Sequence, residues 1–215
     1  MYVKLIIVSI VSVIVGGFLA ASMLSRMGGV GGVPSAGPVA GTSGTIATTG
    51  KALVGGPFTL TDHTGKRVTE KDFLGRNLLV FFGFTYCPDI CPSGLSVLTA
   101  ALDQLGSAAD TVTPVFVTID PERDTPEKMA EYIKSFHPRL VGLTGSKEDI
   151  AAAVKAYRVY AKKVPDDRNP KSYTMDHSSI AYLMGTDGQF RAFFPDLTKP
   201  DPLAAEIRKA LASKS

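Results

Sequence analysis

The 215-residue sequence contains no tryptophan, only two cysteines and only three histidines. Acidic residues are missing from its N-terminal quarter, because no Asp or Glu precedes Asp62. Two cysteines cannot form the dense disulfide framework of a small secreted domain. The part of the chain that follows residue 50 is long enough to bury a core without covalent cross-links, so the cysteines are free to serve another purpose.

The charge balance shows no large excess of either sign. Of the 23 Lys and Arg residues, Lys4 and Arg26 precede position 51, which leaves 21 basic against 20 acidic residues in 51–215. This net charge of +1 provides no basic face for nucleic acid. The hydrophobic content of 45% also excludes a disordered chain. We therefore expect a folded domain that does not bind nucleic acid.

Residues 1–27 are predicted to be a membrane anchor. The segment Leu5–Leu24 carries no charge, and a helix of its 20 residues would span the hydrocarbon core of about 30 Å. Lys4 before it and a single Arg26 after it favour an inside N-terminus and an exported C-terminal part. A cleaved signal peptide is the alternative, because Ala20–Ser22 offers small residues to a peptidase. The length of the apolar run favours the uncleaved anchor.

A flexible linker is predicted at 28–50, which holds eight glycines, two prolines and no charge. Residues 51–215 are predicted to form one domain. The expected organisation is thus an anchor at 1–27, a linker at 28–50 and a folded domain at 51–215 outside the membrane.

The pattern of residues 51–215 predicts an α/β fold, with a central mixed sheet flanked by helices and preceded by a β-hairpin. The turn Asp62–Gly65 lies between two short β-prone runs and predicts that hairpin. Apolar runs predict further strands at 77–84, 112–119, 140–143, 179–184 and 189–194. Capping and periodicity predict helices at 92–106, from Pro126 onward, from Ser146 to Tyr157, and at 201–212.

Both cysteines lie in Cys87-Pro-Asp-Ile-Cys91, between a predicted buried strand and a predicted helix. Because Pro92 disfavours helical dihedrals at Cys91, we expect Cys91 at the N-cap, where the positive helix end favours a thiolate. The spacing is compatible with a disulfide or with two sulfurs on one metal. The alternatives are buried small hydrophobes or a purely structural disulfide. A disulfide closing so short a loop would restrain little chain entropy.

Three histidines are available to complete a metal site. His63 lies in the predicted hairpin turn, where exposure is expected, and His137 precedes a proline at a helix end, where it suits a C-terminal cap. His177 lies in a predicted loop at 173–179, and from the residues alone it is equally well explained as a ligand or as a loop residue. Two thiolates and one imidazole fall short of a structural zinc site. They suit copper better, because soft sulfur selects Cu(I) and imidazole accepts both oxidation states.

The segment Gly83-Phe-Thr-Tyr-Cys87-Pro-Asp-Ile-Cys91-Pro92 resembles the CxxxC signature of the SCO/SenC family of copper-binding, thioredoxin-like proteins. The segment 117–127 resembles the second motif of that family. Further matching pieces follow in the expected order at 142–145, 157–160 and 176–178. The resemblance covers about residues 53–212.

This resemblance implies a thioredoxin-like fold that holds copper, as Cu(I) or Cu(II), through Cys87, Cys91 and His177. It also implies a role in assembling the CuA centre of cytochrome c oxidase subunit II, at the inner membrane with the domain facing the periplasm. Another periplasmic copper chaperone or a thioredoxin-like reductase would be a further partner. Asp89 and Asp176 are candidates for orienting the imidazole or setting the local charge; the alternative is that both are solvated loop carboxylates.

Three functions compete. The leading hypothesis is a copper chaperone, which binds and delivers a metal and is not an enzyme. The alternative is a thiol–disulfide reductase that keeps the CuA-ligand cysteines of subunit II reduced. A peroxiredoxin-like peroxidase would need threonine three residues before its reactive cysteine, and Phe84 occupies that position before Cys87.

In the second motif, Asp120 and Arg123 suit a turn held by a salt bridge, or a docking surface for a partner.

Overall fold

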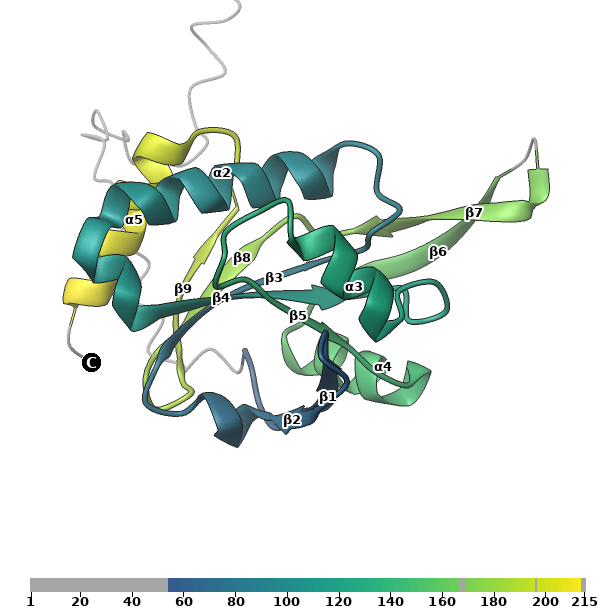
Figure 1. The fold of residues 1–215 in the computed structure, drawn as a ribbon, viewed down its shortest axis with the longest axis horizontal. Coiled ribbons are helices and arrows are strands. Elements are labelled where there is room, and N and C mark those ends of the chain that lie inside the picture. Colours follow the sequence, from purple (N-terminus) through teal and green to yellow (C-terminus); the bar gives the residue numbers. More distant parts are fainter. Residues whose placement is uncertain (1–53, 167–168, 196, 214–215) are drawn as a thin grey trace, which may run out of the picture. The chain divides into compact units, whose positions relative to one another are not determined.

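The computed structural model describes residues 54–166, 169–195 and 197–213, and its centre is a seven-stranded sheet (Figure 1). The strands follow the order β2-β1-β5-β4-β3-β8-β9. Their bounds are β1 (Thr59–Asp62), β2 (Arg67–Thr69), β3 (Asn77–Gly83), β4 (Val112–Thr118), β5 (Val141–Thr144), β8 (Ala181–Met184) and β9 (Phe190–Phe194). Strand β4 is parallel to β3 and β5, whereas β8 is antiparallel to β3. The predicted mixed sheet and N-terminal hairpin are therefore confirmed.

The helices also follow the predicted order. They are α2 (Ile90–Leu105), α3 (Pro126–Ile133), α4 (Lys147–Ala156) and α5 (Pro200–Ala212), with 3-10 turns η1 (Glu70–Phe73) and η2 (Gly106–Thr111). Two predicted caps are present: the side chain of Thr125 accepts a hydrogen bond from the amide of Lys128, and that of Ser146 accepts one from Asp149. Each cap pairs an amide that the first turn leaves free, which fixes where these helices begin.

Helices α2 and α3 cover one face of the sheet. Phe81 of β3 lies opposite Phe116 of β4 in the parallel ladder. Phe81 packs against Gly94 of α2, and the ring of Phe116 lies 5.5 Å from that of Tyr132 in α3. Because side chains alternate along a strand, the neighbouring residues of β3 point to the other face.

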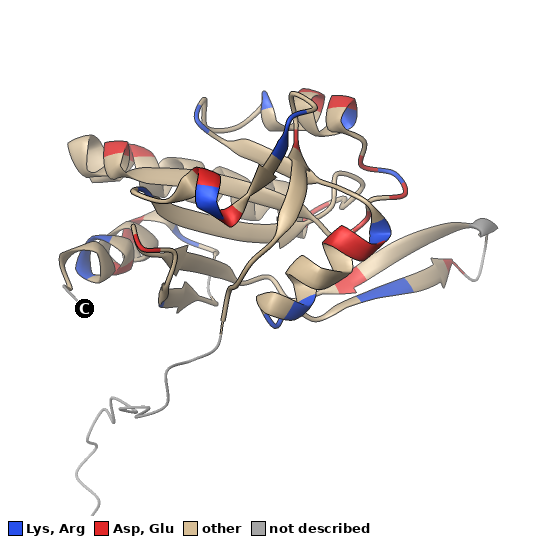
Figure 2. Cartoon of the chain, turned by 90° about the horizontal axis from the view of Figure 1, so that it is seen from below, with Lys and Arg blue, Asp and Glu red and all other residues tan. Residues whose placement is uncertain are grey.

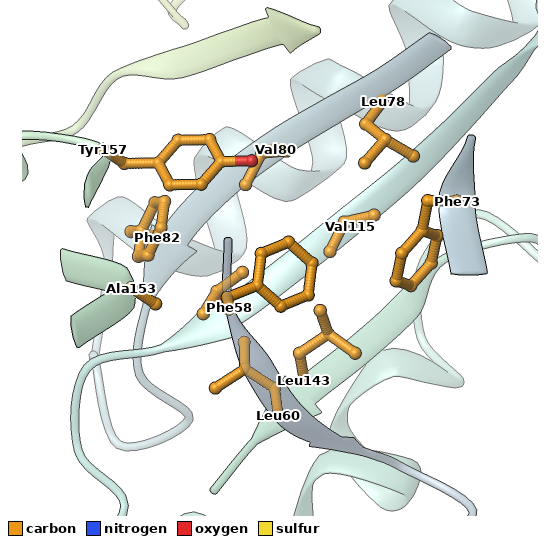
Figure 3. A pocket seen from close by; sticks show the side chains of 11 residues that line it. Phe58, Leu60, Phe73, Leu78, Val80, Phe82, Val115, Leu143, Ala153 and Tyr157 are labelled. Atoms are coloured by element: carbon orange, nitrogen blue, oxygen red, sulfur yellow. The ribbon is translucent and has the colours of Figure 1, made fainter. Parts of the chain in front are cut away.

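The other face carries an apolar core that α4 and the N-terminal hairpin enclose (Figure 3). Alternate residues of β3 and β4 line it together with Phe58, Leu60, Phe73, Leu143, Ala153 and Tyr157. The space left among these side chains has a volume of about 10 Å³. Such a small apolar space gives a water molecule no polar partner, so this layer is a packed interior and not a ligand pocket.

Strands β6 (Ala161–Asp166) and β7 (Asn169–His177) pair antiparallel with each other and not with the main sheet. They form an arm that projects away from the sheet (Figure 1). The predicted loop at 173–179 is wrong over most of its length, because β7 runs to His177. Along 173–177, three partly buried residues (Tyr173, Met175 and His177) alternate with exposed Thr174 and Asp176, which is a short strand pattern that contradicts the predicted loop.

The predicted membrane span Leu5–Leu24 and the linker at 28–50 lie outside the described residues. Among the residues that are described, no helix combines the length and the hydrophobicity needed to cross a bilayer.

Candidate metal centre

The structure brings Cys87, Cys91 and His177 together, although 86 positions separate Cys91 from His177. Their three ligand atoms all lie within 4.8 Å of one another. The sulfur of Cys91 lies 3.5 Å from Nε2 of His177. Cys91 is buried and Cys87 is half-buried, and both thiols are free. One metal ion can thus contact two sulfurs and one imidazole nitrogen.

The start of α2 places the two sulfurs. The N-cap of this helix lies two residues earlier than predicted. The N-cap is Asp89, and Cys91 is the second helical residue rather than the N-cap. Pro92 is tolerated inside the first turn because the amide it lacks would have no helical partner there. The free amide of Cys91 instead donates to the sulfur of Cys87 over 3.3 Å, so the helix start does favour a thiolate, on Cys87.

The two thiols differ strongly in acidity. The Cys91 thiol donates a hydrogen bond to Cys87, and this bond contributes most to lowering the pKa of Cys87, which falls to about 4. Smaller contributions come from His177 and from the amides of Cys91 and Asp89, and partial burial opposes the shift. The same hydrogen bond, together with burial, raises the pKa of Cys91. At neutral pH, Cys87 is therefore the thiolate and Cys91 retains its proton.

His177 ends β7 with its ring oriented by two neighbours. The ring packs edge-on against Phe84, with centroids 5.8 Å apart. Its Nδ1 lies 3.0 Å from the carbonyl oxygen of Ser178. A carbonyl only accepts, so Nδ1 carries a proton, and Nε2, which lies 3.5 Å from the Cys91 sulfur, is the nitrogen that binds a metal once it carries no proton. That neutral tautomer is the one that a metal ligand requires.

The Ser178 carbonyl could not be identified from the sequence, since any residue type supplies one. Asp89 and Asp176, the predicted supporting carboxylates, are both exposed and both line an open hollow of about 240 Å³ beside Cys87 and His177. The carboxylate of Asp89 accepts a hydrogen bond from the Ser93 hydroxyl over 3.2 Å. Their influence on the site stays a prediction.

The two other histidines lie outside this cluster. His63 is half-buried, and its Nδ1 accepts a hydrogen bond from the Gly142 amide over 3.3 Å. His137 is buried and lies beyond Lys134, the C-cap of α3, so its predicted capping role is wrong. Its Nδ1 accepts from the Arg139 amide over 3.2 Å.

A buried carboxylate that the sequence analysis did not single out fixes the loop before Cys87. Asp124 is fully buried and accepts hydrogen bonds from the amide and hydroxyl of Thr85, over 3.0 and 2.6 Å. The Thr118 hydroxyl donates a further bond of 2.6 Å. Burial raises the pKa of Asp124 even though these bonds oppose the shift. The second motif thus connects the end of β4 to the cysteine loop. Its predicted ion pair between Asp120 and Arg123 is present.

A pair of cysteines at the start of the helix that follows an inner strand of a mixed sheet defines a thioredoxin-like protein, to which the arm adds a histidine. A protein-family model described as SCO1/SenC matches residues 46–212. The chain belongs to the SCO1/SenC family.

Named relatives support this assignment. The human "Protein SCO1 homolog, mitochondrial" is 48% identical over 160 residues, which cover 74% of this chain and 53% of that protein. The chain therefore spans about half the length of this curated relative.

Solved structures of the family are similar as well. The crystal structure of Arabidopsis thaliana ScoI with copper bound is 44% identical, with a TM-score of 0.69, and the match covers 74% of this chain and 98% of that one. Bradyrhizobium japonicum ScoI with copper bound is 46% identical, with a TM-score of 0.66, over 74% and 99% of the two chains.

Proposed function

We propose that this protein is a copper chaperone that binds one copper ion through Cys87, Cys91 and His177. The observation that carries the proposal is the approach of two sulfurs and one imidazole nitrogen to within 4.8 Å. Thiolates select Cu(I), and the imidazole supports Cu(II) as a third donor. The relatives solved with copper bound support the choice of metal.

The proposed role is assembly of the CuA centre of cytochrome c oxidase subunit II, as the family resemblance implies. The protein would act from the inner membrane, with residues 51–215 in the periplasm and the linker at 28–50 allowing them to reach a membrane-bound partner. Another periplasmic copper chaperone or a thioredoxin-like reductase would supply copper or electrons. The open hollow beside Cys87 and His177 supports transfer by direct contact.

Thiol–disulfide reduction is the second candidate, and the low pKa of Cys87 favours it. The Cys87 thiolate would attack a partner disulfide, releasing one partner thiolate and forming a mixed disulfide. Cys91, after losing its proton, would then attack Cys87, releasing the second partner thiolate and leaving a Cys87–Cys91 disulfide. Two electrons pass from the dithiol to the partner, and this chemistry does not require His177.

Copper analysis of the purified protein tests the proposed site. We expect one copper per chain under reducing conditions, and loss of that copper when Cys87→Ser and Cys91→Ser are combined. Unchanged stoichiometry in the double variant would refute the site. His63→Ala is the matched control, because His63 lies outside the cluster.

His177→Ala separates the two functions. We expect it to lose most Cu(II) affinity, retain part of the Cu(I) affinity that two thiolates provide, and reduce a test disulfide within about threefold of wild type, since exchange depends on the thiols. In a strain that depends on this protein, the chaperone role predicts loss of CuA assembly. Normal assembly at low copper with normal levels of the variant would favour the reductase.

A further inference from the structure

The two halves of the metal centre belong to parts of the fold that different contacts hold in place. Cys87 and Cys91 lie at the junction of β3 and α2, which the core fixes. His177 belongs to the arm, whose strands pair only with each other among the described strands. The distance between sulfur and imidazole therefore depends on what holds the arm against the cysteine loop.

Arg123 lies between these two parts. Its guanidinium carbon is 3.8 Å from the ring centre of Tyr173, which is on β7, and 4.7 Å from the ring centre of Tyr86, which directly precedes Cys87. Its NH1 group also donates to the main-chain carbonyl of Tyr173 over 2.9 Å. One side chain thus contacts the neighbour of a cysteine ligand and the strand that ends in His177.

Asp120 holds this arrangement to the main sheet. It follows the end of β4, it is buried with 2% exposure, and its amide bonds to the Thr118 hydroxyl over 2.9 Å. One carboxylate oxygen pairs with Nε of Arg123, and the other accepts the phenol hydrogen of Tyr173 over 2.7 Å. Hydrogen bonds to a buried carboxylate are stronger than those between neutral groups. The arm is therefore tied to the sheet through these charged groups, in addition to the apolar contacts of Ala161 and Met175 with the core.

We propose that Asp120, Arg123 and Tyr173 form a latch that holds the β6–β7 arm against the cysteine loop, and that Arg123 and Tyr173 are thereby positioning residues for His177. The proposal rests on the proposed copper-binding function. It adds that the latch determines the fraction of molecules in which the His177 imidazole, the third donor, is in place. The ion pairs of Glu122 with Lys147 and Lys163 lie at the exposed rim, where such pairs stabilise little.

The latch has a quantitative consequence for metal binding. For a ligand that needs the arm in place, the apparent affinity is the intrinsic affinity multiplied by the fraction of molecules in which the arm is latched. Cu(II), which needs the imidazole, should weaken when the latch is lost. Cu(I) and disulfide exchange, which the two sulfurs support, should change little. Loss of the latch should therefore lower Cu(II) affinity selectively, as loss of His177 does.

The test uses Cu(II) and Cu(I) competition titrations of the full chain in detergent. Tyr173→Ala removes both the stacking on Arg123 and the bond to Asp120, and we expect Cu(II) affinity to fall by about tenfold with Cu(I) affinity within about twofold of wild type. Tyr173→Phe keeps the ring and loses the phenol hydrogen bond, so a smaller drop of about threefold is expected. Tyr160→Phe is the matched control at the exposed base of the arm and should match wild type.

A double-mutant cycle distinguishes positioning from general damage to the protein. If Tyr173 acts through His177, adding Tyr173→Ala to His177→Ala should lower the residual Cu(II) affinity no further. Equal losses in the two backgrounds would overturn the latch, as would wild-type Cu(II) affinity in Tyr173→Ala. NMR relaxation of the metal-free protein provides a second measurement, in which Tyr173→Ala and Arg123→Lys should increase the mobility of the arm and leave β3 and β4 unchanged.

Failure of the proposed function is separable from failure of the latch. If wild type and the double cysteine variant bind copper equally, the copper site is wrong, and the NMR measurement alone decides whether the latch exists. If wild type binds copper and His177→Ala loses Cu(II), but the arm of metal-free Tyr173→Ala stays as rigid as in wild type, the latch is wrong and the copper site stands.

Discussion

Cys87 and Cys91 are the same residue type four positions apart, yet the fold gives them opposite properties. The sulfur of Cys87 accepts hydrogen bonds at the start of a helix while half-buried, and Cys91 is fully buried. Hydrogen bonds to a thiolate favour the charged form, and burial disfavours it. Cys87 is therefore the more acidic and the more accessible of the two thiols.

Alkylation of the metal-free reduced protein tests this difference. Because the pKa of Cys87 is lowered to about 4, its thiolate is fully formed well below neutral pH. Modification by iodoacetamide should be nearly independent of pH between about 6 and 8 and should decline only as pH falls through about 4. An ordinary thiol would instead accelerate through its usual pKa of about 8.5. Peptide mass spectrometry should find Cys87 labelled first; preferential labelling of Cys91 would contradict the assignment.

Gly83 shows how closely the last residue of β3 approaches the metal centre. A Cβ at this position would lie 2.7 Å from the sulfur of Cys91 and 2.8 Å from Cε2 of Phe116. Both distances are well inside van der Waals contact, and Phe116 belongs to the packed core. A side chain here would force Cys91, and with it the start of α2, to move.

We expect Gly83→Ala to destabilise the fold by about 1–3 kcal/mol and to weaken copper binding by displacing Cys91. Urea unfolding and copper titration measure the two effects. Gly94→Ala is the matched control, because its Cβ would meet Phe81 at 3.4 Å and because alanine favours the helix interior. Equal behaviour of the two variants would show that the strand end tolerates a side chain.

At the scale of elements, local signals fix where α3 and α4 start. In α4, Ser146 and Asp149 form a capping box in which each side chain accepts from the backbone of the other. Two acidic residues, Glu148 and Asp149, also lie in the first turn, where the helix dipole favours negative charge. The start of α4 is therefore encoded within four residues, and Arg67 adds a tertiary ion pair of 3.0 Å to the same Asp149 oxygen.

Ser146→Ala should lower the free energy of unfolding by about 1 kcal/mol, since the Asp149 amide loses its partner. Thermal and urea unfolding of the purified protein measure this. Ser107→Ala in η2 is the control and should stay within about 0.5 kcal/mol of wild type. A loss at Ser146 no greater than at Ser107 would show that the cap contributes nothing. Copper binding should be unaffected, because α4 supplies no ligand.

At the scale of the whole molecule, charges of both signs are scattered over the described part of the chain (Figure 2). This distribution agrees with the near-neutral balance of residues 51–215. Among the described residues, large apolar side chains are more than half exposed beside the candidate metal centre, at Tyr86 and Ile90, and also elsewhere, at Leu74, Tyr160 and Phe193.

The segment Leu5–Leu24 predicts that the protein stays in the membrane, with residues 51–215 on the outer face. Alkaline extraction of membranes should not release the protein, and protease added to spheroplasts should digest the exported part. Release as a soluble protein that begins near Ser22 or Met23 would indicate a cleaved signal peptide instead.

The sequence by itself determined the features that depend on neighbouring residues. The apolar runs predicted β3, β4, β8 and β9, and the caps predicted α3 and α4. The two cysteines were identified because their spacing and the following proline are local. The family resemblance, not periodicity, added His177 to them.

Only the tertiary structure decided how His177 reaches the sulfurs. The contacts of the arm with Asp120 and Arg123 join residues about fifty positions apart. The Ser178 carbonyl that orients the imidazole and the Asp124 carboxylate that holds Thr85 were invisible for the same reason. Hydrogen bonds between distant segments depend on three-dimensional proximity, which residue types and local spacing do not specify.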